Sequence, residues 1–146
     1  MTQHIYWFSN QTPYTVYFDN SQSAPDATSA QPFQAVMTGG ANGDYCNVPD
    51  CSGQQYFYQY HMTLFGVDVE NDNTVVFAVM FWANDYQSEV LQYSLNGAYF
   101  NVKDVTLGGT INEGDPFGMV LSYDSDSGPD ITAVPGAAPP QGAGAG

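Results

Sequence analysis

Carboxylates and amides gather in three short stretches of the sequence, and oxygen-rich stretches of this kind can bind a cation. They are DVENDN, NEGD and DSDSGPD, which begin at residues 68, 112 and 124. Ca²⁺ takes about six to eight oxygen ligands, several of them from carboxylates at alternate positions of a loop. No cofactor is required by the sequence, and calcium is the one that these stretches allow, with the candidate ligands Asp68, Glu70, Asp72, Asp124, Asp126 and Asp130.

The same stretches have a second interpretation, because Asp and Asn favour tight turns without any metal. Asp124-x-Asp126 followed by Gly128 matches only the opening of an EF-hand calcium loop. The glycine stands at the fifth place instead of the sixth, and the closing glutamate is missing. Calcium binding and simple turn formation both stay open.

Tyrosines alternate with amide residues in runs that are typical of strands. If QQYFYQYHMTLF (54–65) is a strand, its tyrosines share one face and His61 lies on the other. Met62 and Leu64 would continue the tyrosine face into the core. Flat amphipathic rings beside amides suit a half-exposed surface for sugars or for another subunit. The candidate ligand-binding residues are Tyr56, Tyr58, Gln59, Tyr93 and Tyr99.

Catalytic chemistry has little support in the sequence. His4 and His61 lie on different predicted strands, and no nucleophile is spaced to pair with either. Glycoside hydrolysis needs two carboxyl groups about 5 to 10 Å apart. The three glutamates stand beside turn residues and lack the desolvated setting that raises the pKa of a proton donor. We assign no catalytic residue.

The charge balance restricts the partners. Fifteen acidic residues oppose one basic residue, Lys103, and the formal net charge is -14. Binding to nucleic acid or to anionic membranes relies on several Lys or Arg side chains, so neither is expected. The longest apolar run, residues 75–83, is shorter than the ~20 residues of a membrane-spanning helix. The predicted partners are carbohydrate or another neutral ligand, a cation, or copies of the chain itself.

Cys46 and Cys51, in CNVPDC, are the only two cysteines. They predict a disulfide, with a pair of free thiols as the alternative, and two cysteines alone do not make a zinc site. With one Lys and no Arg, the chain presents trypsin-like proteases with a single site, which is compatible with an extracellular or surface location. However, the first ten residues lack the features of a secretory signal, so a cytoplasmic location stays open. Asn10-Gln11-Thr12 matches the N-glycosylation sequon.

Period-two patterns predict the elements that must position these residues. Asn96-Gly97 suits a tight hairpin between two alternating runs, and no window predicts a helix. The fold class is all-β: an antiparallel β-sandwich or jelly roll of about eight strands, with a Pro/Gly-rich C-terminal tail. The predicted strands cover residues 3–9, 14–19, 33–38, 54–65, 74–83, 90–95, 98–102, 103–107 and 118–123, with one further brief segment at 110–112.

The composition changes after Tyr123. We expect residues 1–123 to form the sandwich domain, whereas residues 124–146 are rich in Asp and then in Pro and Gly. Such a composition is poor at forming a packed core. The second segment is therefore predicted to be a tail, or an arm that docks on a neighbouring subunit.

Few charges and many Tyr, Asn and Gln residues favour a non-enzymatic protein for extracellular or surface recognition or assembly. It would bind carbohydrate or another neutral ligand through tyrosine-rich strand faces. The first alternative is a self-assembling subunit of a filament, shell, inclusion or surface layer, whose C-terminal arm contacts a neighbour. The second is a jelly-roll enzyme that acts on glycosides through loop carboxylates.

Overall fold

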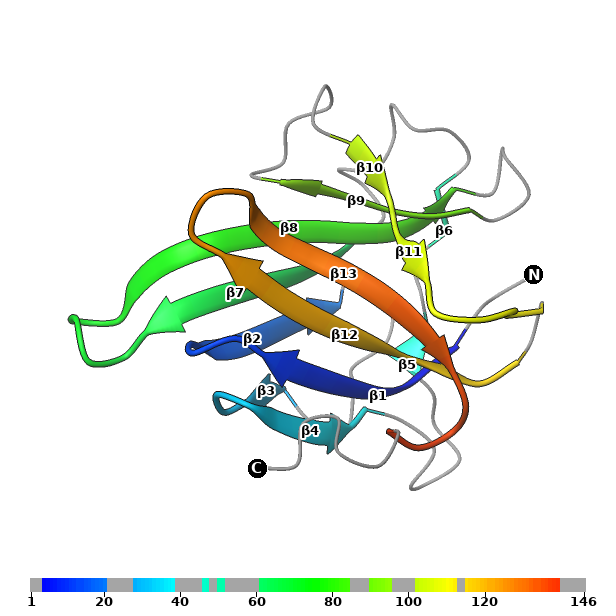
Figure 1. Cartoon of the computed structure of the whole chain (residues 1–146), viewed down its shortest axis with the longest axis horizontal. Coiled ribbons are helices and arrows are strands. Elements are labelled where there is room, and N and C mark those ends of the chain that lie inside the picture. Colours follow the sequence, from blue (N-terminus) through cyan, green and yellow to red (C-terminus); the bar gives the residue numbers. More distant parts are fainter. Residues whose placement is uncertain are drawn as a thin grey trace.

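The alternating pattern of the sequence forms a β-sandwich of two sheets in the computed structural model (Figure 1). The structure describes residues 4–20, 28–38, 46–47, 50–51, 61–84, 90–95, 102–112 and 115–139. None of these residues lies in a helix. The prediction of an all-β sandwich with mainly antiparallel strands is confirmed, and the jelly-roll order of strands stays a prediction.

The first sheet has the strand order β11-β13-β12-β1-β4, with β5 also beside β1. Its strands are β1 (His4–Gln11), β4 (Gln34–Met37), β5 (Cys46–Asn47), β11 (Thr106–Leu107), β12 (Phe117–Asp124) and β13 (Gly128–Pro135). Neighbours are mostly antiparallel, but β1 runs parallel to β12.

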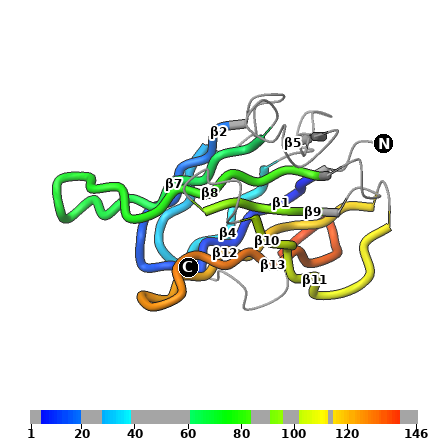
Figure 2. The backbone as a smooth tube through the Cα atoms, turned by 90° about the horizontal axis from the view of Figure 1, so that it is seen from above, coloured from blue at the N-terminus to red at the C-terminus, as the bar shows by residue number. Residues whose placement is uncertain are grey.

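The second sheet has the order β10-β9-β8-β7-β2-β3, with β6 also beside β8. Its strands are β2 (Thr15–Asn20), β3 (Ser29–Ala30), β6 (Asp50–Cys51), β7 (Met62–Asp68), β8 (Thr74–Asn84), β9 (Val90–Leu95) and β10 (Val102–Asp104). In Figure 2 the layer with β7 and β8 lies above the layer with β12 and β13. The described part of the chain has thirteen strands, eight of them with four residues or more, whereas about eight strands were predicted.

The core lies between the sheets, and β8 shows how the chain fills it. Phe77, Val79 and Phe81 point inward and are buried. Trp82 is buried on the opposite face of β8, where it contacts Met80 and Val102. The run is therefore a central strand, as predicted, but its second face is fully buried only at Trp82, whereas Val76, Ala78 and Met80 are half-buried there. On the neighbouring strand β7, Met62 and Leu64 are likewise buried, as predicted.

The C-terminal region differs from the prediction. Residues 128–135 form β13, which pairs antiparallel with β12 along its whole length and buries Ile131 and Ala133 in the core. The sandwich therefore extends past residue 123 to at least Pro135. The alternation in DITAV was obscured by the surrounding prolines, which stand near the strand ends, where missing N–H groups are tolerated. The part of the predicted arm from residue 140 onward lies outside the described residues.

Trp7 holds the chain that follows β13. Its indole Nε1 donates a hydrogen bond to the Gly136 carbonyl oxygen at 3.0 Å, and the Gly136 N–H donates to the Pro116 carbonyl oxygen at 3.0 Å. The Trp7 ring lies against Gly118 of β12, where a Cβ atom would overlap it. The start of the predicted arm is therefore bound to its own sandwich.

The hairpin predicted at Asn96-Gly97 has a different register on its second strand. A two-residue turn would place Val102 opposite Leu91, whereas Val102 pairs with Ser94. Residues 96–101 lie outside the described residues.

The segment at 110–112, predicted as a brief strand, is irregular.

The buried side chain of Asn10 joins two places where the chain crosses between the sheets. Its Nδ2 donates to the carbonyl oxygens of Tyr14 at 2.7 Å, Ala30 at 3.2 Å and Gln31 at 3.0 Å. Its Oδ1 accepts hydrogen bonds from the N–H of Thr12 at 3.0 Å and from the Thr12 hydroxyl at 2.7 Å. The residues that follow β1 and β3 are thereby bonded to one amide.

These bonds bear on the glycosylation sequon at Asn10. The side chain has 0% exposure, and its Nδ2 is the atom that a glycan would occupy. A glycan there would remove donors from three carbonyl oxygens and would need space that the core fills. The folded chain therefore cannot carry a glycan at Asn10.

We expect Asn10→Asp to lower the free energy of unfolding by at least about 2 kcal/mol, because the substitution removes the donor of three hydrogen bonds and places a buried carboxylate oxygen against carbonyl oxygens. Chemical denaturation measures the change. The matched control is Asn71→Asp, since the Asn71 side chain is exposed in the β7–β8 turn. Equal stability losses in the two variants would contradict the role of the Asn10 amide.

Candidate functional site

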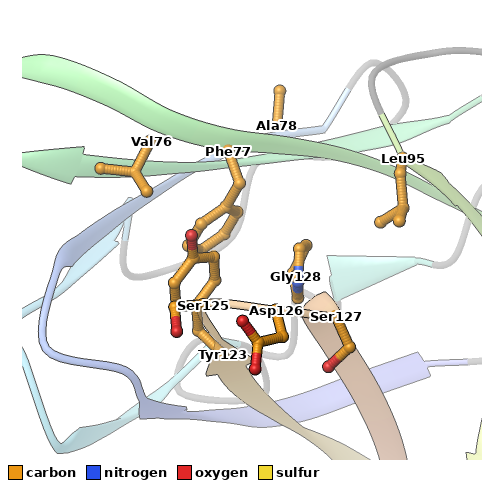
Figure 3. Close-up of a pocket in the computed structure, with 10 residues that line it drawn as sticks. Val76, Phe77, Ala78, Leu95, Tyr123, Ser125, Asp126, Ser127 and Gly128 are labelled. Carbon is orange, nitrogen blue, oxygen red and sulfur yellow. The ribbon is translucent and has the colours of Figure 1, made fainter.

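A pocket of about 280 Å³ lies between β8 and the hairpin of β12 and β13 (Figure 3). The second sheet contributes Val76, Phe77, Ala78 and Leu95. The hairpin contributes Tyr123, Ser125, Asp126, Ser127, Gly128 and Pro129. The volume is near the lower limit of known ligand pockets, about 300 Å³. The pocket therefore suits one small ligand or one ring of a larger one.

An aromatic cluster forms one side of the pocket. The rings of Phe77 and Tyr123 stack with centroids 5.4 Å apart and an interplanar angle of 17°. Tyr14 packs edge-on against both, with its ring centroid 5.4 Å from that of Tyr123 and 6.4 Å from that of Phe77. Figure 3 shows the Phe77 and Tyr123 rings side by side, with Leu95 on the other side of the pocket. The pocket therefore has an apolar wall contributed by both sheets.

Gly66 on β7 makes room for the Phe77 ring. A Cβ atom at Gly66 would overlap three atoms of that ring. The register between β7 and β8 also shifts here, because Val67 pairs with Val75 while Gly66 pairs with Phe77, which leaves Val76 as the extra residue of a β-bulge. The missing side chain and the bulge together set the position of Phe77 in the pocket wall.

The turn of the β12–β13 hairpin forms the polar side of the pocket. Asp124 pairs with Gly128 across a three-residue turn. One Asp124 carboxylate oxygen, Oδ1, accepts hydrogen bonds from the N–H groups of Asp126 at 2.7 Å and Ser127 at 3.3 Å. Gly128, the residue that closes this turn, has a φ of 83°, a left-handed conformation that favours glycine. The place of the glycine in DSDSG is thus explained by the turn, without a calcium loop.

The carboxylates at the β7–β8 turn are used in a similar way. The Asp68 Oδ1 atom accepts a hydrogen bond from the Glu70 N–H at 3.2 Å, and Asp72 and Asn73 adopt left-handed conformations. Asp and Asn tolerate such conformations better than most residues. In the described ranges, no group of three His, Cys, Asp or Glu side chains is arranged to hold a metal ion. Calcium binding stays a prediction.

The prediction that Tyr93 lies on a half-exposed face is wrong. Tyr93 is only 2% exposed and belongs to the core between the sheets. Its hydroxyl donates a hydrogen bond to Asp130 Oδ1 at 3.0 Å, so the predicted calcium ligand Asp130 holds β13 to β9. Burial, followed by the bond to Asp130, raises the pKa of Tyr93 from 10.0 to about 12. Tyr93 is a structural residue.

Among the predicted site residues that the structure describes, Asp126 alone lines this pocket. Tyr56, Tyr58, Gln59 and Tyr99 lie outside the described residues. The backbone of Cys46 pairs with Ile5 in the first sheet, and that of Cys51 pairs with Asn84 in the second, but their side chains are not described. The disulfide stays a prediction.

Comparison with known proteins gives no relative. No family model, no curated protein and no solved structure matches the chain. The described residues include no helix that is long and apolar enough to cross a membrane.

We expect Tyr93→Phe to lower the free energy of unfolding by about 0.5–1.5 kcal/mol at neutral pH, which is the usual contribution of one hydrogen bond. The pH dependence is more specific. Because the Tyr93 pKa is higher in the folded state, the protonated Tyr93 hydroxyl contributes fully to the free energy of unfolding below pH 10.0. This contribution is lost as the pH rises to about 12. Chemical denaturation across this window should show that the free energy of unfolding of the native chain falls as the pH rises. The fall should be smaller in Tyr93→Phe. The exposed Tyr17 provides the control Tyr17→Phe, and an equal reduction there would contradict this account.

Gly66→Ala should destabilise the fold by about 1–3 kcal/mol, because the added methyl displaces the Phe77 ring from a packed site. Adding Phe77→Leu should relieve the overlap. The double variant should therefore lose less stability than the sum of the two single variants, as measured by chemical denaturation. Additive losses would contradict the contact between Gly66 and Phe77.

Proposed function

We propose that this protein is a non-catalytic recognition module that binds carbohydrate in the pocket between β8 and the β12–β13 hairpin. One observation carries the proposal: the pocket combines an aromatic wall with a hydroxyl-rich turn. Phe77 and Tyr123 offer apolar surface to the C–H groups of a sugar ring. Ser125 and Ser127 offer hydroxyl groups to the sugar's own hydroxyls.

The carboxylates near the pocket favour binding over hydrolysis. Asp126 is the single carboxylate among the described residues that line it. Glycoside hydrolysis generally uses two carboxyl groups on opposite sides of the bond, and Asp124 already accepts two backbone hydrogen bonds. We therefore prefer recognition to the glycoside-active enzyme.

The tyrosine-rich faces remain part of the proposal as further contacts. Tyr56, Tyr58, Gln59 and Tyr99 would extend the binding surface for a longer glycan. An extracellular or surface location and a Cys46–Cys51 disulfide belong to the same proposal. The backbones of the two cysteines belong to opposite sheets, so a bond between them would join the sheets.

Self-assembly is the second candidate, and exposed apolar side chains favour it. Phe33 and Met37 are about half exposed at β4, the last described strand of the first sheet. Val69 and Val75 are exposed on the β7–β8 hairpin, which projects from the sandwich in Figures 1 and 2. Unpaired strand edges with apolar side chains can bind a second copy. Light scattering across a concentration series tests this, and a monomer at every concentration would contradict it.

Carbohydrate binding is tested with Tyr123→Ala and a tetrasaccharide such as cellotetraose or chitotetraose. We expect affinity to fall roughly three- to tenfold, because an aromatic contact contributes about 0.5–1.5 kcal/mol. Calorimetry measures the affinity.

Tyr17→Ala is the matched control, since Tyr17 is an exposed tyrosine on β2 and does not line the pocket. Tyr123→Phe keeps the stacked ring and should bind nearly as well as the native chain. Thermal melting checks that each variant is folded. Equal affinities for Tyr123→Ala and Tyr17→Ala, or no binding to any saccharide, would contradict the proposal.

A further inference from the structure

We infer that the preferred ligand is an amino sugar whose protonated amine binds the Asp126 carboxylate. This inference rests on the proposed function and names the ligand class of the same pocket. It follows from the combination of a ring-sized pocket that has an apolar wall with a carboxylate that accepts no hydrogen bond from the residues that the structure describes.

Asp124 and Asp126 have different roles in the hairpin turn. The Asp124 Oδ1 atom accepts two backbone hydrogen bonds that form the turn. Asp126 contributes its N–H to the turn, and its exposed carboxylate lines the pocket. In Figure 3 this carboxylate lies below the Phe77 ring and beside Tyr123. Asp126 is thus placed to meet a group that also touches the aromatic wall.

The protein provides little positive charge to balance this carboxylate. Lys103 is the only Lys or Arg in the whole chain, and it lies on β10, outside the lining residues. The hydroxyls of Ser125 and Ser127 are neutral neighbours. A ligand with a protonated amine would supply the missing charge, and an aromatic face favours such a cation as well.

The shape and charge of the pocket argue against the other cationic or apolar occupants. A bare calcium ion needs about six to eight oxygen ligands, whereas the apolar side chains of Phe77, Leu95 and Val76 form a large part of the lining here. The β7–β8 hairpin of a second copy would bring Asp68, Glu70 and Asp72 toward Asp126, and like charges repel. A sugar ring with an amine can place its C–H groups against the apolar side chains of the pocket and its positive charge against Asp126.

Three β-1,4-linked tetrasaccharides test the inference because they differ only at C2. Cellotetraose carries a hydroxyl there, chitotetraose an acetamide, and the glucosamine tetramer an amine. Affinities are measured by calorimetry at low salt and at a mildly acidic pH, where the amines of the glucosamine tetramer are protonated. We expect the glucosamine tetramer to bind about two- to fivefold more tightly than cellotetraose, as for an exposed ion pair. Added salt should reduce the difference.

Asp126→Asn keeps the shape of the side chain and should abolish the preference without changing the thermal melting temperature. Asp19→Asn is the matched control, because it removes the same charge from an exposed position on β2 that does not line the pocket. It separates a contact at Asp126 from the general attraction of a cation to an acidic protein.

The outcomes distinguish the two levels of the proposal. Loss of the preference in Asp126→Asn but not in Asp19→Asn supports the inference. Equal binding of all three saccharides with sensitivity to Tyr123→Ala overturns the amine preference and leaves carbohydrate recognition in place. A preference that both aspartate variants reduce equally also overturns the inference. No binding of any saccharide overturns the inference and the proposed function together.

Discussion

The buried amide of Asn10 is the interaction on which the rest of this sandwich depends. The chain leaves the first sheet after β1 and returns to it after β3, and carbonyl oxygens at both crossings accept hydrogen bonds from one side chain. Asn10 donates to three of them, and unpaired buried acceptors would be costly. One of these oxygens belongs to Tyr14, whose ring packs against Phe77 and Tyr123. The amide that joins the sheets therefore also positions the aromatic wall of the pocket.

Local patterns in the sequence predicted much of the fold, because the strand period depends on neighbouring residues. The run at 74–83 and the run at 90–95 form strands β8 and β9 with nearly the predicted bounds. Strand β13 was missed because its prolines and glycines are typical of a tail. Its alternation is nevertheless regular, since Ile131 and Ala133 face inward. Two prolines near the ends of a strand remove little hydrogen bonding, so composition was a poorer guide than periodicity.

The site was harder to predict, because facing and proximity depend on contacts distant in sequence. Tyr93 stands between Gln92 and Ser94, which indicated a half-exposed strand, yet all three residues are buried. The other face of this sheet is also covered near Trp82. Polar neighbours in the sequence therefore did not indicate a solvent-exposed face. The pocket itself joins Phe77 to Tyr123 and the turn that follows it. Only the packing of the two sheets brings these residues together, and no local motif could have shown it.

The acidic composition gains meaning when the use of each carboxylate is considered. Asp68 and Asp124 accept backbone hydrogen bonds in turns, and Asp130 binds the Tyr93 hydroxyl. These three were predicted as calcium ligands, but the carboxylate of each already accepts a hydrogen bond within the protein. Asp126 differs, because its carboxylate borders a pocket while its N–H completes the turn. The turn that Asp124 stabilises thus holds a second aspartate at a fixed place beside two aromatic rings. A net charge of -14 would attract any cation to the surface, whereas the ligand that we propose for this local arrangement is a cation that also has an apolar face.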